Sequence, residues 1–86
     1  PAEKEFKIEF RNEADYRGFL SAGYTVIRTQ DIYNQATIRI SSGDTGKLLR
    51  TLNGYDLKFI SEIPYTLERH FKEVLKTKRE DSKNVQ

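Results

Sequence analysis

The chain has 86 residues, of which 33% are charged and 36% hydrophobic, including five Phe and five Tyr, and this composition indicates one small folded domain rather than a disordered segment. It contains no cysteine, which excludes disulfides and thiolate metal clusters, and no apolar run approaches the ~20 residues needed to cross a bilayer. The excess of positive charge falls within residues 76–86, so residues 1–75 are neutral and lack the charge expected of a nucleic-acid-binding domain.

The first part of the chain predicts a strand followed by a helix. Charged and apolar residues alternate in the strand, whose buried face is predicted to consist of Phe6, Ile8 and Phe10. Asn12 is suited to cap the helix that follows, and Gly23 is suited to end it. The apolar face of this helix is predicted to consist of Tyr16, Phe19 and Leu20.

A β-hairpin is predicted next. Residues 24–32 are rich in β-branched and aromatic side chains, but their alternation is imperfect, which indicates a bulge or a two-sided edge strand. Residues 33–35 supply turn chemistry, and the following strand alternates regularly, with a buried face of Ala36, Ile38 and Ile40.

The rest of the chain predicts a helix, a strand and another helix. Residues 41–44 end the third strand and offer a cap for a helix that stops at Asn53-Gly54 and buries Leu48, Leu49 and Leu52. The fourth strand spans residues 57–63, stops at Pro64, and is expected to place on one face Leu57, Phe59, Ser61 and Ile63. A third helix is expected from Thr66, and the apolar face of this helix is predicted to consist of Leu67, Phe71, Val74 and Leu75. Residues 76–86 are expected to form a polar, flexible tail.

The order of these elements, β-α-β-β-α-β-α, predicts the fold class α+β. The first six elements match a ferredoxin-like domain within residues 1–75, with a four-stranded antiparallel sheet and two helices on one face. Right-handed crossovers place the first and third strands at the centre and the other two at the edges. The additional C-terminal helix would cover an edge or end of the sheet or dock on a partner. The side chains expected to be structural are Phe6, Ile8, Phe10, Ile38, Ile40, Leu52, Phe59, Leu67 and Phe71.

Three patterns were candidates for a reactive site, and none meets the requirements. Residues 42–47 (SGDTGK) are similar to a phosphate loop, but the glycines are too close together and Leu48 replaces the magnesium-binding hydroxyl. The single histidine, His70, has no nucleophile, base or second metal ligand beside it. The carboxylates are scattered along the sequence, and Glu9, Glu62 and Glu68 could meet only through tertiary folding. We therefore expect no catalytic, cofactor-binding or metal-binding residues, and no enzyme activity in this chain.

Two binding roles that occur on this fold also lack a positive signal. RNA-recognition modules stack bases on aromatic residues of the first and third strands. Here the third strand has none, and the face away from the core is expected to carry Lys7, Glu9, Thr37 and Arg39. Small-molecule regulatory domains often have a glycine-rich turn after the first strand, where this chain has Arg11-Asn12-Glu13.

The segment KFISEIPYTLERHFKEV, residues 58–74, resembles the end of ATP-binding subunits of bacterial ABC transporters, particularly the drug- and peptide-exporter type of Gram-positive bacteria. In that family a strand ends in F-[IV]-S-E, and a short turn leads to a helix that begins Leu-Glu-x-x-Phe. The matching residues are Phe59, Ile60, Ser61 and Glu62, then Thr66, Leu67, Glu68 and Phe71. Residues 5–19, EFKIEFRNEADYRGF, are similar to the beginning of that family's C-terminal accessory region, so the resemblance covers most of residues 4–75.

The resemblance implies that this chain is a non-catalytic accessory or regulatory domain of an ABC-transporter ATP-binding protein. The parent subunit would couple ATP hydrolysis to transport, and its ATP and Mg²⁺ would bind in an upstream ATPase domain whose motifs are not in this sequence. The implied partners are that ATPase domain, its dimer mate, and the membrane permease through the parent. The implied location is cytoplasmic, without direct membrane insertion and without a nucleic-acid partner.

The main alternative is a stand-alone small-molecule-sensing or protein-interaction module of ferredoxin-like fold, which would bind a metabolite or protein by itself. A nucleic-acid binder that uses the basic tail is a further alternative. It would require a salt-dependent affinity that disappears when residues 76–86 are deleted.

Overall fold

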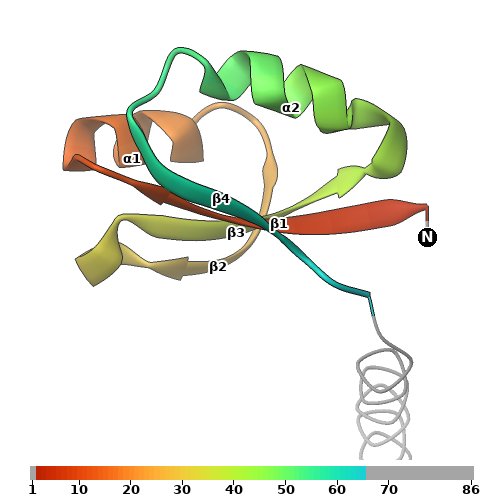
Figure 1. Ribbon diagram of the computed structural model, residues 1–86. Coiled ribbons are helices and arrows are strands. Elements are labelled where there is room, and N and C mark those ends of the chain that lie inside the picture. The colour runs from red at the N-terminus through yellow and green to blue at the C-terminus, as the bar shows by residue number, and fades with distance from the viewer. Residues whose placement is uncertain (1, 66–86) are drawn as a thin grey trace, which may run out of the picture.

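Four strands form one antiparallel sheet in the computed structural model, which describes residues 2–65 of the chain (Figure 1). The strands are β1 (Glu3–Phe10), β2 (Thr25–Gln30), β3 (Gln35–Ser41) and β4 (Leu57–Ile63), in the spatial order β2-β3-β1-β4. Two helices, α1 (Glu13–Leu20) and α2 (Thr45–Leu52), lie on the same face of the sheet (Figure 1). The predicted fold class is confirmed: α+β, with the ferredoxin-like βαββαβ order and with β1 and β3 at the centre.

Several predictions concern residues outside this description. These are the third helix, with Leu67, Phe71, Val74 and Leu75, the tail at residues 76–86, and the side chains of Glu68 and His70. Within residues 2–65, none of the helices has the length and apolar character required to cross a membrane.

The core lies between the sheet and the two helices and matches the predicted faces of the first two elements. In the β1–β3 register, Phe6 is opposite Ile38 and Ile8 is opposite Ala36, so their side chains share one face. The buried apolar residues are Phe6, Ile8, Phe10, Tyr16, Phe19, Ala36, Ile38, Ile40, Leu48 and Leu52. The structural roles predicted for Phe6, Ile8, Phe10, Ile38, Ile40 and Leu52 are therefore confirmed.

An aromatic cluster connects α1 to the sheet and to the loop before β4. The ring of Phe19 lies 5.2 Å from the ring of Phe10, 5.2 Å from that of Tyr24 and 5.7 Å from that of Tyr55, measured between centroids. Such distances allow favourable stacked and edge-to-face contacts in addition to the burial of apolar surface. Phe19 is therefore the centre of packing at this end of the domain.

The hairpin between β2 and β3 explains the imperfect alternation of the second strand. Val26 is opposite Ile38 but Arg28 is opposite Thr37, so Ile27 is an extra residue in a β-bulge. Every residue of β2 is exposed, and the strand is at an edge of the sheet. Asn34 forms the turn with a left-handed backbone conformation (φ 52°), which asparagine tolerates better than most residues. The predicted bulge and the predicted edge position are both present.

The prediction for α2 was wrong at one position. Leu48 and Leu52 are 1% and 3% exposed, as expected, but Leu49 is 50% exposed. A helix turns by about 100° per residue, so Leu48 and Leu52 lie on one face four residues apart, while the next residue, Leu49, is rotated towards solvent.

The face assigned to β4 was also wrong, because a second bulge lies in this strand. Glu9 is opposite Phe59 but Phe10 is opposite Leu57, which leaves Lys58 as the extra residue. The bulge reverses the alternation, so Leu57 and Ile60 pack against the core. Phe59 pairs with Glu9 on the other face of the sheet and is 38% exposed, so its predicted structural role in the core is not supported.

Candidate functional site

The segment at residues 42–47 forms a strand end and a helix start. Ser42–Asp44 make a short 3-10 turn, and the Thr45 hydroxyl donates a hydrogen bond to the Ser42 carbonyl over 3.0 Å. The Ser42 amide donates to the Ala2 carbonyl over 2.9 Å, which ties this turn to the beginning of β1. These are local structural bonds, and the segment does not have the spacing of a phosphate-binding loop.

A polar depression lies beside this segment, between the start of α2 and the adjoining ends of β2 and β3. Its volume is about 430 Å³, and its lining includes Glu3, Tyr24, Arg39, Asp44, Lys47 and Thr51. The two basic and two acidic side chains in this list balance each other, so the depression has no net preference for a charged ligand.

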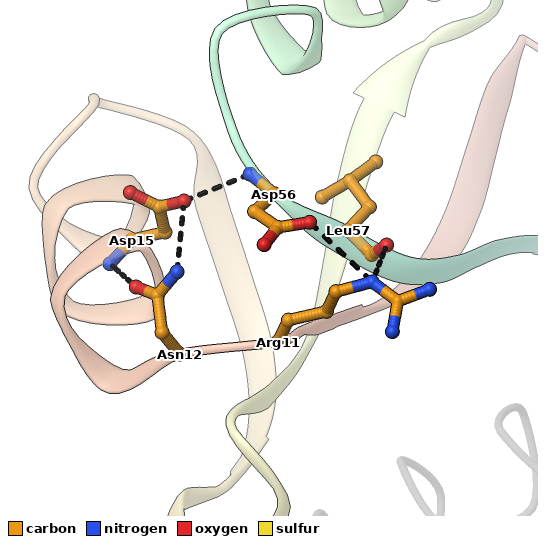
Figure 2. Close-up of polar contacts among 5 residues, drawn as sticks. All are labelled: Arg11, Asn12, Asp15, Asp56 and Leu57. Carbon is orange, nitrogen blue, oxygen red and sulfur yellow. Dashed lines mark hydrogen bonds and ion pairs between the residues drawn. The ribbon is translucent and has the colours of Figure 1, made fainter.

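The turn after β1 is bound to the loop before β4 by a polar network, drawn in Figure 2. Asn12 caps α1, because its side-chain oxygen accepts the Asp15 amide at 2.8 Å. The Asp15 carboxylate accepts a bond from the Asn12 side chain (3.3 Å) and from the Asp56 amide (2.8 Å). Arg11 donates to the Leu57 carbonyl (3.1 Å) and forms an ion pair with Asp56 (3.4 Å). The turn after β1 therefore has a structural role: it holds the start of α1 against the loop before β4.

We expect the Asn12→Ala variant to lose about 1 kcal/mol of unfolding free energy, because the Asp15 amide loses its capping acceptor. Urea titration of the 86-residue chain measures this loss. The control is Asn53→Ala, since Asn53 follows the C-terminal end of α2 and has helical backbone angles. Equal losses in the two variants would contradict a capping role for Asn12.

The face of the sheet away from the helices carries paired charges. Glu5 and Arg39 form an ion pair at 3.1 Å, and Glu9 forms one with Lys58 at 3.2 Å. Glu9 also accepts a hydrogen bond from the Gln35 side chain at 2.9 Å. Among the residues predicted for this face, Thr37 is buried, with 3% exposure. These pairs neutralise Arg39 and Lys58, and the same face also carries Lys7 and Arg28, which both lie opposite Thr37.

Of the three carboxylates considered as a catalytic group, the two that the structure describes, Glu9 and Glu62, lie on opposite faces of the sheet. Glu9 shares the outer face of the sheet with Lys58, as described above. Glu62 is opposite Phe6, hence on the core-facing side at the end of β4, where it pairs with Lys4 at 3.5 Å. Glu68 lies outside the described residues. Within residues 2–65, no group of three or more potential metal ligands occurs.

Tyr16 is the titratable group with a shifted pKa in the described part of the chain. Burial, and then a hydrogen bond that its hydroxyl donates to Asp31, raise the pKa of this phenol above its usual 10.0. Asp31 also pairs with Arg17 at 3.6 Å, so the carboxylate holds the turn before β3 against α1.

The raised pKa predicts a loss of stability at high pH. The neutral phenol is favoured in the folded state, so its contribution is complete below pH ~10 and falls as the pH rises towards the folded-state pKa. We therefore expect the advantage of the wild type over Tyr16→Phe, measured by urea unfolding, to be constant at neutral pH and to shrink as the pH rises above about 10. Tyr33→Phe, at a 57% exposed position, is the control and should show no such change. A constant difference for Tyr16→Phe would contradict the assignment.

The surface that sequence reasoning missed is the exposed side of β4. Phe59 lies on the outer face of the sheet, opposite Glu9, and the next residues on that face are Ser61, opposite Lys7, and Ile63, opposite Glu5. Only the bulge at Lys58 puts these residues there, and the local sequence carries no distinct signal for it. β4 thus presents Phe59 and Ile63 on the outer face, and among the described strands it pairs with β1 alone.

Comparison of the chain with protein-family models, with characterised proteins and with solved structures finds no significant match.

Proposed function

We propose that this chain is a non-catalytic accessory domain of the ATP-binding subunit of a bacterial ABC transporter of the drug- and peptide-exporter type. It acts by contact with the ATPase domain of its own subunit or of the dimer mate, where ATP and Mg²⁺ bind. The subunit is held at the cytoplasmic side of the membrane by its permease.

The two segments that carry the family resemblance support this proposal, because they belong to neighbouring strands. Residues 5–19 include most of β1 and all of α1 except its last residue, Leu20. Residues 59–62 lie in β4, which pairs with β1. The Arg11–Asp56 and Asp15–Asp56 contacts connect the first segment to the loop immediately before β4 (Figure 2). The resemblance therefore falls on one continuous structural unit.

Phe59 is the observation that carries the proposal. It is the first residue of the F-[IV]-S-E motif, yet it is 38% exposed and faces away from the core. Exposed aromatic residues are common anchors of protein interfaces. A motif residue that the domain does not bury is best explained by contact with a partner, and the resemblance names the ATPase domain as that partner.

The coding sequence immediately upstream of Pro1 tests the assignment of the family. A phosphate loop and an ABC signature motif in the same reading frame would support it. An unrelated domain, or an in-frame stop codon, would overturn it.

The contact itself is tested in the complete ATP-binding subunit with Phe59→Ala. Leu49→Ala is a matched control, since Leu49 is a large apolar residue that is 50% exposed but lies on α2, in the other layer of the domain. We expect ATPase activity or ATP-dependent dimerisation to fall in Phe59→Ala and to stay unchanged in Leu49→Ala. Equal activity in both variants, with both folded, would contradict contact through Phe59.

The polar depression favours a second function, that of a stand-alone small-molecule sensor. Its volume of about 430 Å³ is within the range of small-ligand sites. A thermal-shift screen of the 86-residue chain with nucleotides and amino acids tests this function. A saturable increase in melting temperature that Lys47→Ala removes would support it over the accessory-domain proposal.

A further inference from the structure

Two apolar side chains of β4 lie on the outer face of the sheet, away from the two described helices. Phe59 is opposite Glu9 and Ile63 is opposite Glu5, whereas α1 and α2 pack on the other face (Figure 1). Phe59 is 38% exposed, and Ile63 is partly exposed. The two residues are four positions apart in a strand, a separation of about 13 Å. Neither described helix covers this apolar pair.

The apolar face that the sequence predicts after β4 has the same length as this pair. The helix expected from Thr66 would present Leu67 and Leu75 at the two ends of its apolar face. These residues are eight positions apart, which is about 12 Å along a helix. An amphipathic helix of this length is stabilised mainly by packing of its apolar face. The predicted face therefore needs an apolar surface, and the surface from Ile63 to Phe59 matches its length.

We propose that residues 66–75 fold back as a helix over β4, antiparallel to it, and cover Phe59 and Ile63 on the outer face of the sheet. Leu67 then lies at the level of Ile63, and Leu75 lies at the level of Phe59. The domain gains a third layer on this side, and the apolar surface on β4 is buried by the same chain that forms it.

The short connection supports this segment, rather than another molecule, as the occupant. Pro64 and Tyr65 are the two residues between the end of β4 and Thr66. Elements joined by so few residues usually lie side by side. A short connection also gives the tethered segment an effective concentration in the millimolar range, which a separate molecule does not reach at ordinary protein concentrations. The inner face is already packed with α1 and α2, so the outer face is the one left to a following helix.

This inference does not depend on the proposed function, because it concerns the 86-residue chain by itself. It adds a form of regulation if that function holds. Phe59 is the residue assigned above to contact with the ATPase domain, so the two contacts exclude each other. Residues 66–75 would then be an intramolecular cover that the ATPase domain must displace.

A double-mutant cycle in the 86-residue chain tests the contact between Phe59 and Leu75. We expect Leu75→Ala to lower the melting temperature of the wild type by about 4 °C, and to have a clearly smaller effect when Phe59→Ala is already present, because the contact is then already lost. In a Leu49→Ala background the effect should stay complete, since Leu49 is 50% exposed on α2, in the other layer. An equal effect of Leu75→Ala in all three backgrounds would overturn the proposal.

Cross-linking with a short bismaleimide shows which side of the predicted helix meets the sheet, and the chain has no native cysteine to interfere. Ser61 lies on the outer face between Phe59 and Ile63. His70 borders the predicted apolar face, while Arg69 is rotated by about 100° from it onto the far side. We expect Ser61→Cys to be linked to His70→Cys within one chain, and far less to Arg69→Cys. Equal yields, or links mainly between two chains, would overturn the proposal, and the second outcome would indicate a second copy as the occupant.

Discussion

Replacing Phe19 by alanine is expected to lower the unfolding free energy by about 3–5 kcal/mol, the usual cost of deleting a fully buried aromatic ring. Phe19 is fully buried, and its ring contacts those of Phe10, Tyr24 and Tyr55. The cavity would therefore open at the junction of α1 with the sheet and with the loop before β4. Chemical denaturation of the 86-residue chain measures the loss.

Phe59→Ala is the matched control for this prediction, because the same ring is removed from a 38% exposed position on the other face of the sheet. A loss of no more than about 1 kcal/mol is expected. Comparable losses in the two variants would mean that Phe59 belongs to the core and that the bulge at Lys58 is absent.

Leu48→Ala is expected to cost about 2–5 kcal/mol, since Leu48 is 1% exposed on the inner face of α2. Leu49→Ala removes an identical side chain one position along the helix, where it is 50% exposed, and should change the unfolding free energy by about 0.5 kcal/mol or less. Thermal or chemical unfolding of both variants gives the comparison. A larger loss in Leu49→Ala would reverse the assigned faces of α2.

The sequence predicted those parts of the fold in which local pattern and tertiary environment agree. The alternation of Phe6, Ile8 and Phe10 depends only on the geometry of a strand, and the Asn12 cap depends on a hydrogen bond three residues along the chain. The irregularity of residues 24–32 is visible as a break in alternation, so the bulge in β2 was also predictable.

The two errors arose where neighbouring apolar residues compete for one face. Leu48 and Leu49 are chemically identical, and only the rotation of α2 on the sheet decides which one is buried. In β4, both Phe59 and Ile60 are suited to the core, and the choice depends on register with β1, more than 40 residues away. The candidate surface on β4 follows from that register, so sequence pattern alone does not reveal it. The family assignment stays a prediction.

The central position of β1 affects how this polypeptide acquires its structure. Phe6 has Ile38 as its neighbour on one side and Glu62 on the other, so β1, the first of the described strands, pairs on one side with β4, the last of them. Contacts between such distant positions slow folding, because a large loop must close before any pairing energy is gained. Until residue 63 has emerged, β1 can pair with β3 but lacks β4 on its other side, and this unpaired strand edge is what a chaperone would have to protect.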